Sequence, residues 1–190
     1  MNPTARYALK EWALQVDALL AGKQVLLLRK GGIFEKQGEF EVEHREFFLF
    51  PTLYHEKAGE IVAGAREGLA ELEKRLVPDA TLRLPGLCTV EATQWVDSLD
   101  RLQGLEGLHP LAPSAVEYRY NYGKARGLHV LMLRAYRLPQ PHALPMEKAY
   151  DGCVSWVDLG HDLATAGASP AIADAAFAER IAAVRTRLGA

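Results

Sequence analysis

Basic and tyrosine side chains are interspersed in the segment from Glu117 to Arg137. Glu117 is its only acidic residue, so the segment has a formal charge of +4 in a chain whose net charge is −2. Basic side chains contact phosphates, and tyrosine rings stack on exposed bases. The segment indicates nucleic-acid binding, although strands with tyrosines on one face have a similar composition. Its members are Arg119, Lys124, Arg126, Arg134 and Arg137, with Tyr118, Tyr120, Tyr122 and Tyr136.

Carboxylates and a histidine form a second group with chemical potential. Glu41, Glu43 and His44 could bind a divalent cation or act as acid and base. The two glutamates share one face of an alternating segment in a run of mixed charge, which favours an ordinary exposed strand. A metal-dependent or nucleotide-processing enzyme is therefore the alternative hypothesis.

The patterns typical of other catalytic and metal sites are missing from the sequence. The two cysteines, Cys88 and Cys153, have no partner at metal-ligand spacing, and the six histidines are scattered. There is no Gly-x-Ser-x-Gly elbow and no phosphate-binding loop. We therefore predict no catalytic residue, no metal site and no cofactor.

The composition is typical of one folded domain. The chain has 190 residues, of which 49% are hydrophobic and 24% charged, and a domain commonly has about 150–200 residues. The near-neutral charge excludes a polycation that binds nucleic acid by bulk charge. The N-terminal residues lack an apolar signal core, and no apolar run is long enough to span a membrane, so we expect a cytoplasmic protein without membrane contact.

Hydrophobic periodicity predicts a single α+β domain over residues 1–190, with a mixed or barrel-like sheet flanked by helices. Residues 168–190 are expected to form a C-terminal helix packed on the domain, with Ser169 as N-cap and Pro170 in the first turn. The other predicted helices are 4–20, 57–76 and 98–105. The predicted strands are 24–30, 38–50, 80–96, 128–138 and 152–159, with a loop around 109–113 and an extended connection over 139–145.

Trp156 is the residue that best separates binding from structure. Alternation in its strand places Val154 and Trp156 on one face. If that face is in the core, changing Trp156 to alanine should cost about 3–5 kcal/mol of stability. If the face lines a cleft, Trp156 is a stacking platform, and the change should weaken binding instead.

Several blocks of the sequence resemble a bacterial family known as domain of unknown function 1802. They comprise residues 8–13, 22–33, 43–52 and 150–159. The family has no assigned activity. Some relatives are joined to a restriction-endonuclease-type domain, which implies a part in restriction–modification and a protein partner from such a system.

A shorter segment is similar to the opening of the ASCH and PUA modules, which are small barrels. Residues 19–23 end in a Gly-Lys pair that would close a helix, and the strand that follows ends on Arg29. Modules of this kind hold RNA, or a flipped modified base, in an aromatic-lined cleft. The resemblance implies an ASCH-like or PUA-like fold and the same kind of ligand.

These observations favour a nucleic-acid-binding accessory protein whose contacts with DNA or RNA are weak and sensitive to salt. Its candidate arginines can hold phosphates with a planar fork, and its candidate aromatic residues can stack on bases. A third hypothesis is a structural or homo-oligomeric protein that packs its apolar run 47–50 against a partner. The candidate binding residues are Arg29, Arg45, Arg119, Tyr120, Arg134 and Trp156.

Overall fold

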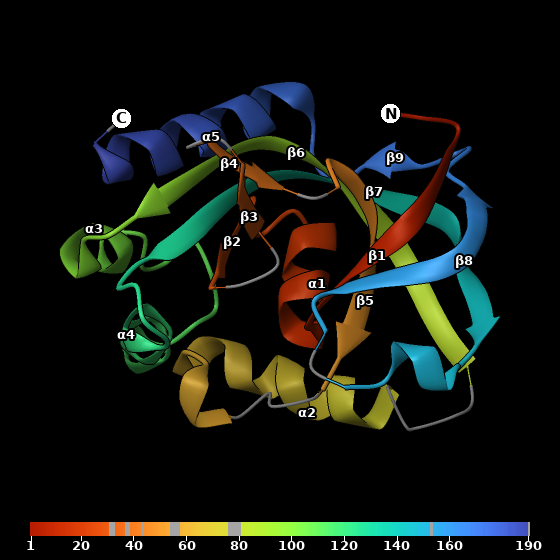
Figure 1. Cartoon of the computed structure of the whole chain (residues 1–190), viewed down its shortest axis with the longest axis horizontal. Coiled ribbons are helices and arrows are strands. Elements are labelled where there is room, and N and C mark those ends of the chain that lie inside the picture. The colour runs from red at the N-terminus through yellow and green to blue at the C-terminus, as the bar shows by residue number, and fades with distance from the viewer. Residues whose placement is uncertain are drawn as a thin grey trace.

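A mixed sheet of seven strands forms the frame of the molecule (Figure 1). The structure is a computed structural model that describes residues 1–30, 33–36, 39–42, 44–53, 58–75, 81–152 and 154–189. The strand order is β2-β7-β6-β5-β1-β8, with the short β9 added beside β7. The α+β class with a mixed sheet is thus confirmed. The strands are β1 (Thr4–Trp12), β2 (Leu26–Arg29), β5 (Glu46–Thr52), β6 (Thr81–Val96), β7 (Leu128–Pro145), β8 (Trp156–Ala164) and β9 (Ser169–Pro170).

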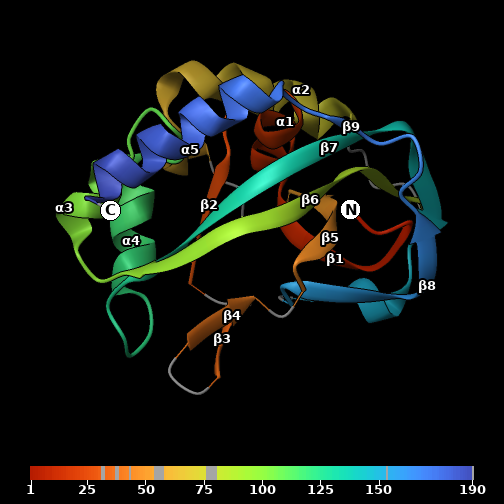
Figure 2. The same ribbon diagram turned by 90° about the horizontal axis from the view of Figure 1, so that it is seen from above.

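One parallel pair makes the sheet mixed. β1 and β5 run parallel, whereas β1 pairs with β8, and β5 with β6, in the antiparallel sense. A separate hairpin of β3 (Ile33–Lys36) and β4 (Glu39–Val42) extends away from the main sheet (Figure 2). Because β1 and β5 are parallel, their carboxyl ends meet at the same edge, where the candidate site is found.

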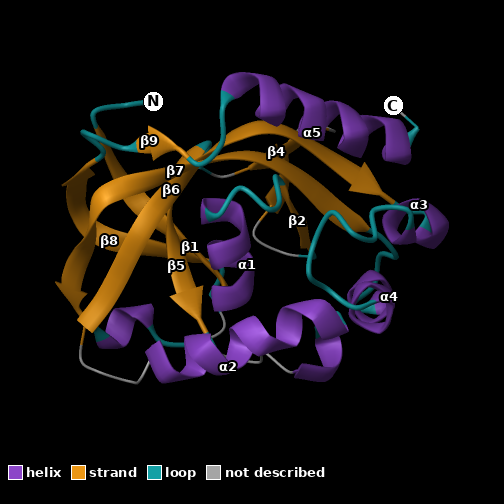
Figure 3. Cartoon of the chain, turned by 180° about the vertical axis from the view of Figure 1, so that it is seen from behind, coloured by secondary structure: helices purple, strands orange, loops and turns teal. Residues whose placement is uncertain are grey.

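Helices cover the sheet on different sides (Figure 3). Val16 and Leu19 of α1 pack on the sheet, and Phe177 and Ile181 of α5 join a second core cluster. In the described ranges, no helix combines the length and apolar character needed to cross a membrane. The helices are α1 (Ala13–Leu20), α2 (Arg66–Arg75), α3 (Leu99–Gln103), α4 (Pro113–Asn121) and α5 (Asp174–Leu188), with short 3-10 turns η1 (Ala58–Glu60), η2 (Ala63–Ala65) and η3 (Lys148–Tyr150).

The predicted N-terminal helix is wrong over its first half. Thr4–Trp12 is strand β1, and only Ala13–Leu20 is helical. β1 lies between β5 and β8. Its consecutive residues Ala8 and Leu9, which point to opposite faces of the sheet, are both fully buried. A strand that is buried on both faces does not alternate between apolar and polar residues, so its apolar spacing can imitate that of a helix.

Three other predicted elements differ in the structure, two of them because of strand pairing. Residues 139–145, predicted as an extended connection, continue β7 and pair with the start of β6. Ser169–Pro170 forms β9 against β7, so the last helix begins at Asp174 instead. The predicted helix 57–76 is described as two 3-10 turns followed by α2.

The apolar run from Phe47 to Phe50 lies in the interior. It belongs to β5, and its four side chains are at most 4% exposed. The hypothesis that this run packs against a partner is therefore wrong, because the core already covers it.

Candidate functional site

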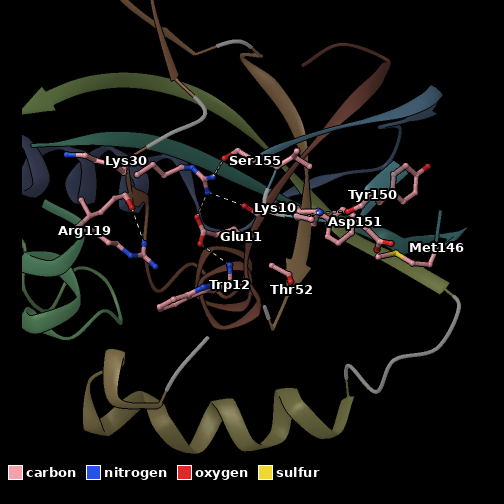
Figure 4. Close-up of a pocket in the computed structure, with 15 residues that line it drawn as sticks. Lys10, Glu11, Trp12, Lys30, Thr52, Arg119, Met146, Tyr150, Asp151 and Ser155 are labelled. Atoms are coloured by element: carbon pink, nitrogen blue, oxygen red, sulfur yellow. Dashed lines mark hydrogen bonds and ion pairs between the residues drawn. The ribbon is translucent and has the colours of Figure 1, made fainter. Parts of the chain in front are cut away.

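A cleft of about 620 Å³ opens where β1, β2 and β5 end, facing α4 and the segments 146–152 and 154–155 (Figure 4). This volume falls in the range of small-molecule sites, about 300–1,000 Å³. Four cationic side chains and two carboxylates line it, a net charge of +2 in a chain of net charge −2. Such a cleft attracts anions. The charged lining residues are Lys10, Arg29, Lys30, Arg119, Glu11 and Asp151.

A buried ion pair holds the base of the cleft together. Arg29 Nη1 lies 2.6 Å from Glu11 Oε2, and Arg29 Nη2 donates to Ser155 Oγ at 3.0 Å. Glu11 Oε1 accepts from the Trp12 backbone N–H and from Gln15 Nε2, each at 2.8 Å. The two charges compensate each other. Because Arg29 of β2 contacts both Glu11 of β1 and Ser155, it holds these three segments of the cleft in place and acts as a positioning residue.

Arg119 has a less complete set of partners. Its guanidinium carbon lies 4.4 Å from the centre of the Trp12 ring, and its Nη1 donates to the Leu28 carbonyl at 3.2 Å. Burial lowers the pKa of Arg119, while the charge of Glu11 acts in the opposite sense. A guanidinium has five N–H donors, so this half-buried cation keeps donors for an anion in the cleft.

The two lysines of the cleft anchor loops. Lys30 Nζ donates to the carbonyls of Tyr120, Ala125 and Gly127, the last at 2.8 Å, and burial lowers its pKa. Lys10 Nζ donates to the carbonyls of Tyr150 and Gly152. Each lysine thus ties one wall of the cleft to the strand ends.

A family profile described as "Domain of unknown function (DUF1802)" matches residues 8–183. The chain belongs to this family. The resemblance noted in the sequence is thus confirmed.

Solved structures of ASCH from Zymomonas mobilis are similar to this DUF1802 protein in architecture. One has 12% sequence identity and a TM-score of 0.47, and the match covers 80% of this chain and 86% of that chain. Two point mutants of the same protein also match, with 13% and 12% identity, TM-scores of 0.45 and 0.47, and coverage of 80% and 84% of this chain and 88% and 91% of those chains. No curated protein matches the sequence.

Two of the six candidate binding residues of this DUF1802 protein meet in the cleft. Arg29 comes from β2 and Arg119 from α4. Sequence reasoning missed three neighbours, Lys10, Trp12 and Lys30. Lys10 and Trp12 lie in the segment predicted to be a helix, and recognising it as a strand that ends beside Arg29 would have pointed to them.

The other candidates have partners elsewhere. Arg45 Nη2 donates to the Val90 carbonyl at 3.3 Å, and the Tyr120 hydroxyl donates to the Asp97 carbonyl at 2.8 Å. Arg134 pairs with Asp174 and lies 4.8 Å from the Phe177 ring centre, a contact between β7 and α5. These three residues are outside the lining of the cleft.

Trp156 and Val154 do not share one environment. β8 begins at Trp156, so the strand alternation does not extend back to Val154. Val154 lines the cleft and is 49% exposed, whereas Trp156 is partly buried and packs edge-on against Phe47 at 5.0 Å between ring centres. Trp156 therefore contributes to packing in this structure.

The carboxylate hypothesis falls mostly outside the described residues. Glu43 and the side chain of Glu41 are not among them, and neither is Cys153. His44 is described, and its ring stacks on Tyr7 with 3.5 Å between ring centres. Among the described residues, no group of three or more histidine, cysteine, aspartate or glutamate side chains is placed to hold a metal ion.

His109, close to Arg119, should make stability depend on pH. Burial, with a smaller effect of the Arg119 charge, lowers its pKa to about 4, and its ring nitrogen accepts the Leu111 N–H at 3.2 Å. Between about pH 6.5 and pH 4 the unfolded chain binds a proton on this histidine and the folded chain does not. The free energy of unfolding therefore decreases as the pH is lowered through this range, by up to about 3 kcal/mol. Urea unfolding at several pH values should show a smaller loss for His109→Gln.

His129 is a second buried histidine that should contribute to the same pH dependence. Burial and the charge of Lys30 lower its pKa to about 4 as well, so His129→Gln should also reduce the slope. Unchanged slopes in both single variants and in the double variant would contradict the assignment.

Proposed function

We propose that this DUF1802 protein binds single-stranded nucleic acid and holds one unstacked nucleotide in the cleft. The observation that carries the proposal is Arg119 stacked on Trp12. This cation is partly removed from water and has unused donors aligned in a planar fork, the arrangement that suits a phosphate.

The two ends of the cleft differ in a way that suits a nucleotide. Arg119 and Lys30 lie at one end, and Met146 and Tyr150 at the other (Figure 4). Met146 and Val154 are 43% and 49% exposed, an unusual exposure for apolar side chains that a flat base would cover. A phosphate beside Arg119 and a base that covers Met146 would satisfy both, while Lys10 and Asp151 at the Met146 end supply polar contacts for the base edge.

The experiment is a titration of labelled single-stranded RNA, single-stranded DNA and duplexes, followed by fluorescence anisotropy. Arg119→Gln should weaken single-strand binding about 10-fold or more, since a charged hydrogen bond contributes about 1.5–3 kcal/mol. The slope of log affinity against log salt should also become shallower by about 0.7, the value for one phosphate contact.

Arg185→Gln is the matched control, because Arg185 is exposed on α5 and does not line the cleft. It should bind as the wild type does. No binding to any of these nucleic acids at about 50 mM salt would remove the proposal. Recognition of a modified base stays a prediction of the resemblance to ASCH and PUA modules, and a partner from a restriction–modification system stays a prediction of the DUF1802 resemblance.

A further inference from the structure

Two exposed tyrosine rings lie at the end of α4, the helix that supplies Arg119 to the cleft: Tyr118 is in the helix, and Tyr122 directly follows its last residue. Tyr118 and Tyr122 are 64% and 62% exposed, and their ring centres lie 6.2 Å apart. The short distance between the ring centres places both rings on one exposed surface at the end of α4. Together with Met146 and Val154 of the cleft, they make up four of the five exposed large hydrophobic side chains among the described residues. Exposed apolar surface is thus concentrated at the cleft and on the helix that supplies Arg119.

Two residues of the cleft lining, Arg119 and Lys30, link the cleft to the exposed tyrosines. The Tyr122 backbone N–H donates to the Arg119 carbonyl at 3.3 Å, which fixes Tyr122 at the end of the helix that carries Arg119. The loop that follows α4 is held against the cleft by Lys30, which donates to the Ala125 and Gly127 carbonyls. The end of α4 and the loop after it therefore lie beside the part of the cleft that Arg119 and Lys30 line.

Positive charge accompanies the rings. Lys124 and Arg126 are exposed in the loop held by Lys30, and Glu117 is the exposed carboxylate on the same helix. With Arg119, the stretch from Glu117 to Arg126 has three cations and one carboxylate, a net charge of +2. Aromatic rings beside exposed cations are the elements with which proteins bind a single strand without reading its sequence.

We infer that Tyr118, Tyr122, Lys124 and Arg126 form a second contact surface, which binds the nucleotides that continue from the one in the cleft. The inference rests on the proposed function and adds the path of the bound nucleic acid, which runs from the cleft across the end of α4. Two bases stack on the two tyrosines, and the cations of the loop contact the phosphates between them. The charge favours nucleic acid over a protein segment, which would need a longer apolar groove.

Length dependence tests this inference. The probes are uridylate and thymidylate chains of one, three and six nucleotides, which separate RNA from DNA. Six nucleotides should bind more tightly than one. The double variant Tyr118→Ala/Tyr122→Ala should lose about 100-fold in affinity for six nucleotides, about 10-fold per ring, and should keep its affinity for one nucleotide.

Two further variants separate stacking from charge. Tyr118→Phe/Tyr122→Phe keeps both rings and should bind as the wild type does. Lys124→Gln/Arg126→Gln should reduce the salt slope by about 1.4 for six nucleotides, two contacts of about 0.7 each, and leave the slope for one nucleotide unchanged.

The outcomes distinguish the two proposals. If one nucleotide binds in an Arg119-dependent way but longer chains bind no more tightly, the second surface is wrong and the proposed function stands. If the alanine double variant binds six nucleotides as well as the wild type does, the second surface is again wrong. If no chain of any length binds, both proposals fall.

Discussion

Replacing Glu11 with alanine should lower the free energy of unfolding by about 3–5 kcal/mol. The change leaves the Arg29 guanidinium largely buried without the carboxylate that now lies 2.6 Å from it. It also removes the acceptor for the Trp12 backbone N–H and for Gln15 Nε2. Urea unfolding at neutral pH, followed by tryptophan fluorescence, measures the effect.

Two controls show that the loss comes from an unpaired buried charge. In Glu11→Met/Arg29→Met both charges are replaced by apolar side chains, so much of the lost stability should return. Asp158→Ala breaks the ion pair with Arg6, in which both side chains are about half exposed, and should hardly change stability. An equally large loss in the double variant would show that Glu11 stabilises the fold by some means other than pairing with Arg29.

Changing Gly127 to alanine should cost about 2–5 kcal/mol of stability, combining an unfavourable backbone conformation with a steric clash. Gly127 has a φ of +141°, and a Cβ built there would lie 2.3 Å from the Trp95 ring and 2.9 Å from the Val96 carbonyl oxygen. Thermal and urea unfolding measure the loss. Because the Gly127 carbonyl also accepts from Lys30, the variant should weaken binding of six nucleotides more than binding of one.

Gly107 provides the matched control. Its φ of +82° is also positive, but a Cβ there would meet no atom within 4 Å. Gly107→Ala should therefore cost only the conformational part, about 1–2 kcal/mol. Equal losses in the two variants would mean that the contact with Trp95 has no part in the effect.

Much of the local structure was predictable from the sequence. The strand predicted over 80–96 is β6, and the short helix predicted over 98–105 is α3, shorter at both ends, with the Ser98 hydroxyl accepting the Arg101 N–H. The C-terminal helix, predicted over 168–190, is present as α5 and buries Phe177, Ile181, Val184 and Leu188 on one face. These elements have regular periodicity and clear start signals, which depend only on neighbouring residues.

The basic and tyrosine segment shows where such reasoning ends. Its first part is helix α4 and its last part is strand β7, so residues close in sequence face different partners. Arg134 contacts α5, and Arg137 donates to the Leu20 carbonyl at 2.6 Å, whereas Arg119 lines the cleft. The formal charge of +4 along this segment is therefore divided among separate sites and does not form one positive surface.

The sequence by itself determined the α+β class, the family and the presence of arginines and aromatic residues suited to nucleic acid. Only the tertiary structure decided which of them meet. Glu11 pairs with Arg29 across 18 residues, and Arg119 stacks on Trp12 from a distant helix. Both contacts exist because β1 is a strand beside β5, buried on both faces. Strand pairing joins segments far apart in the chain, and its free energy depends on partners that the local pattern of β1 does not contain.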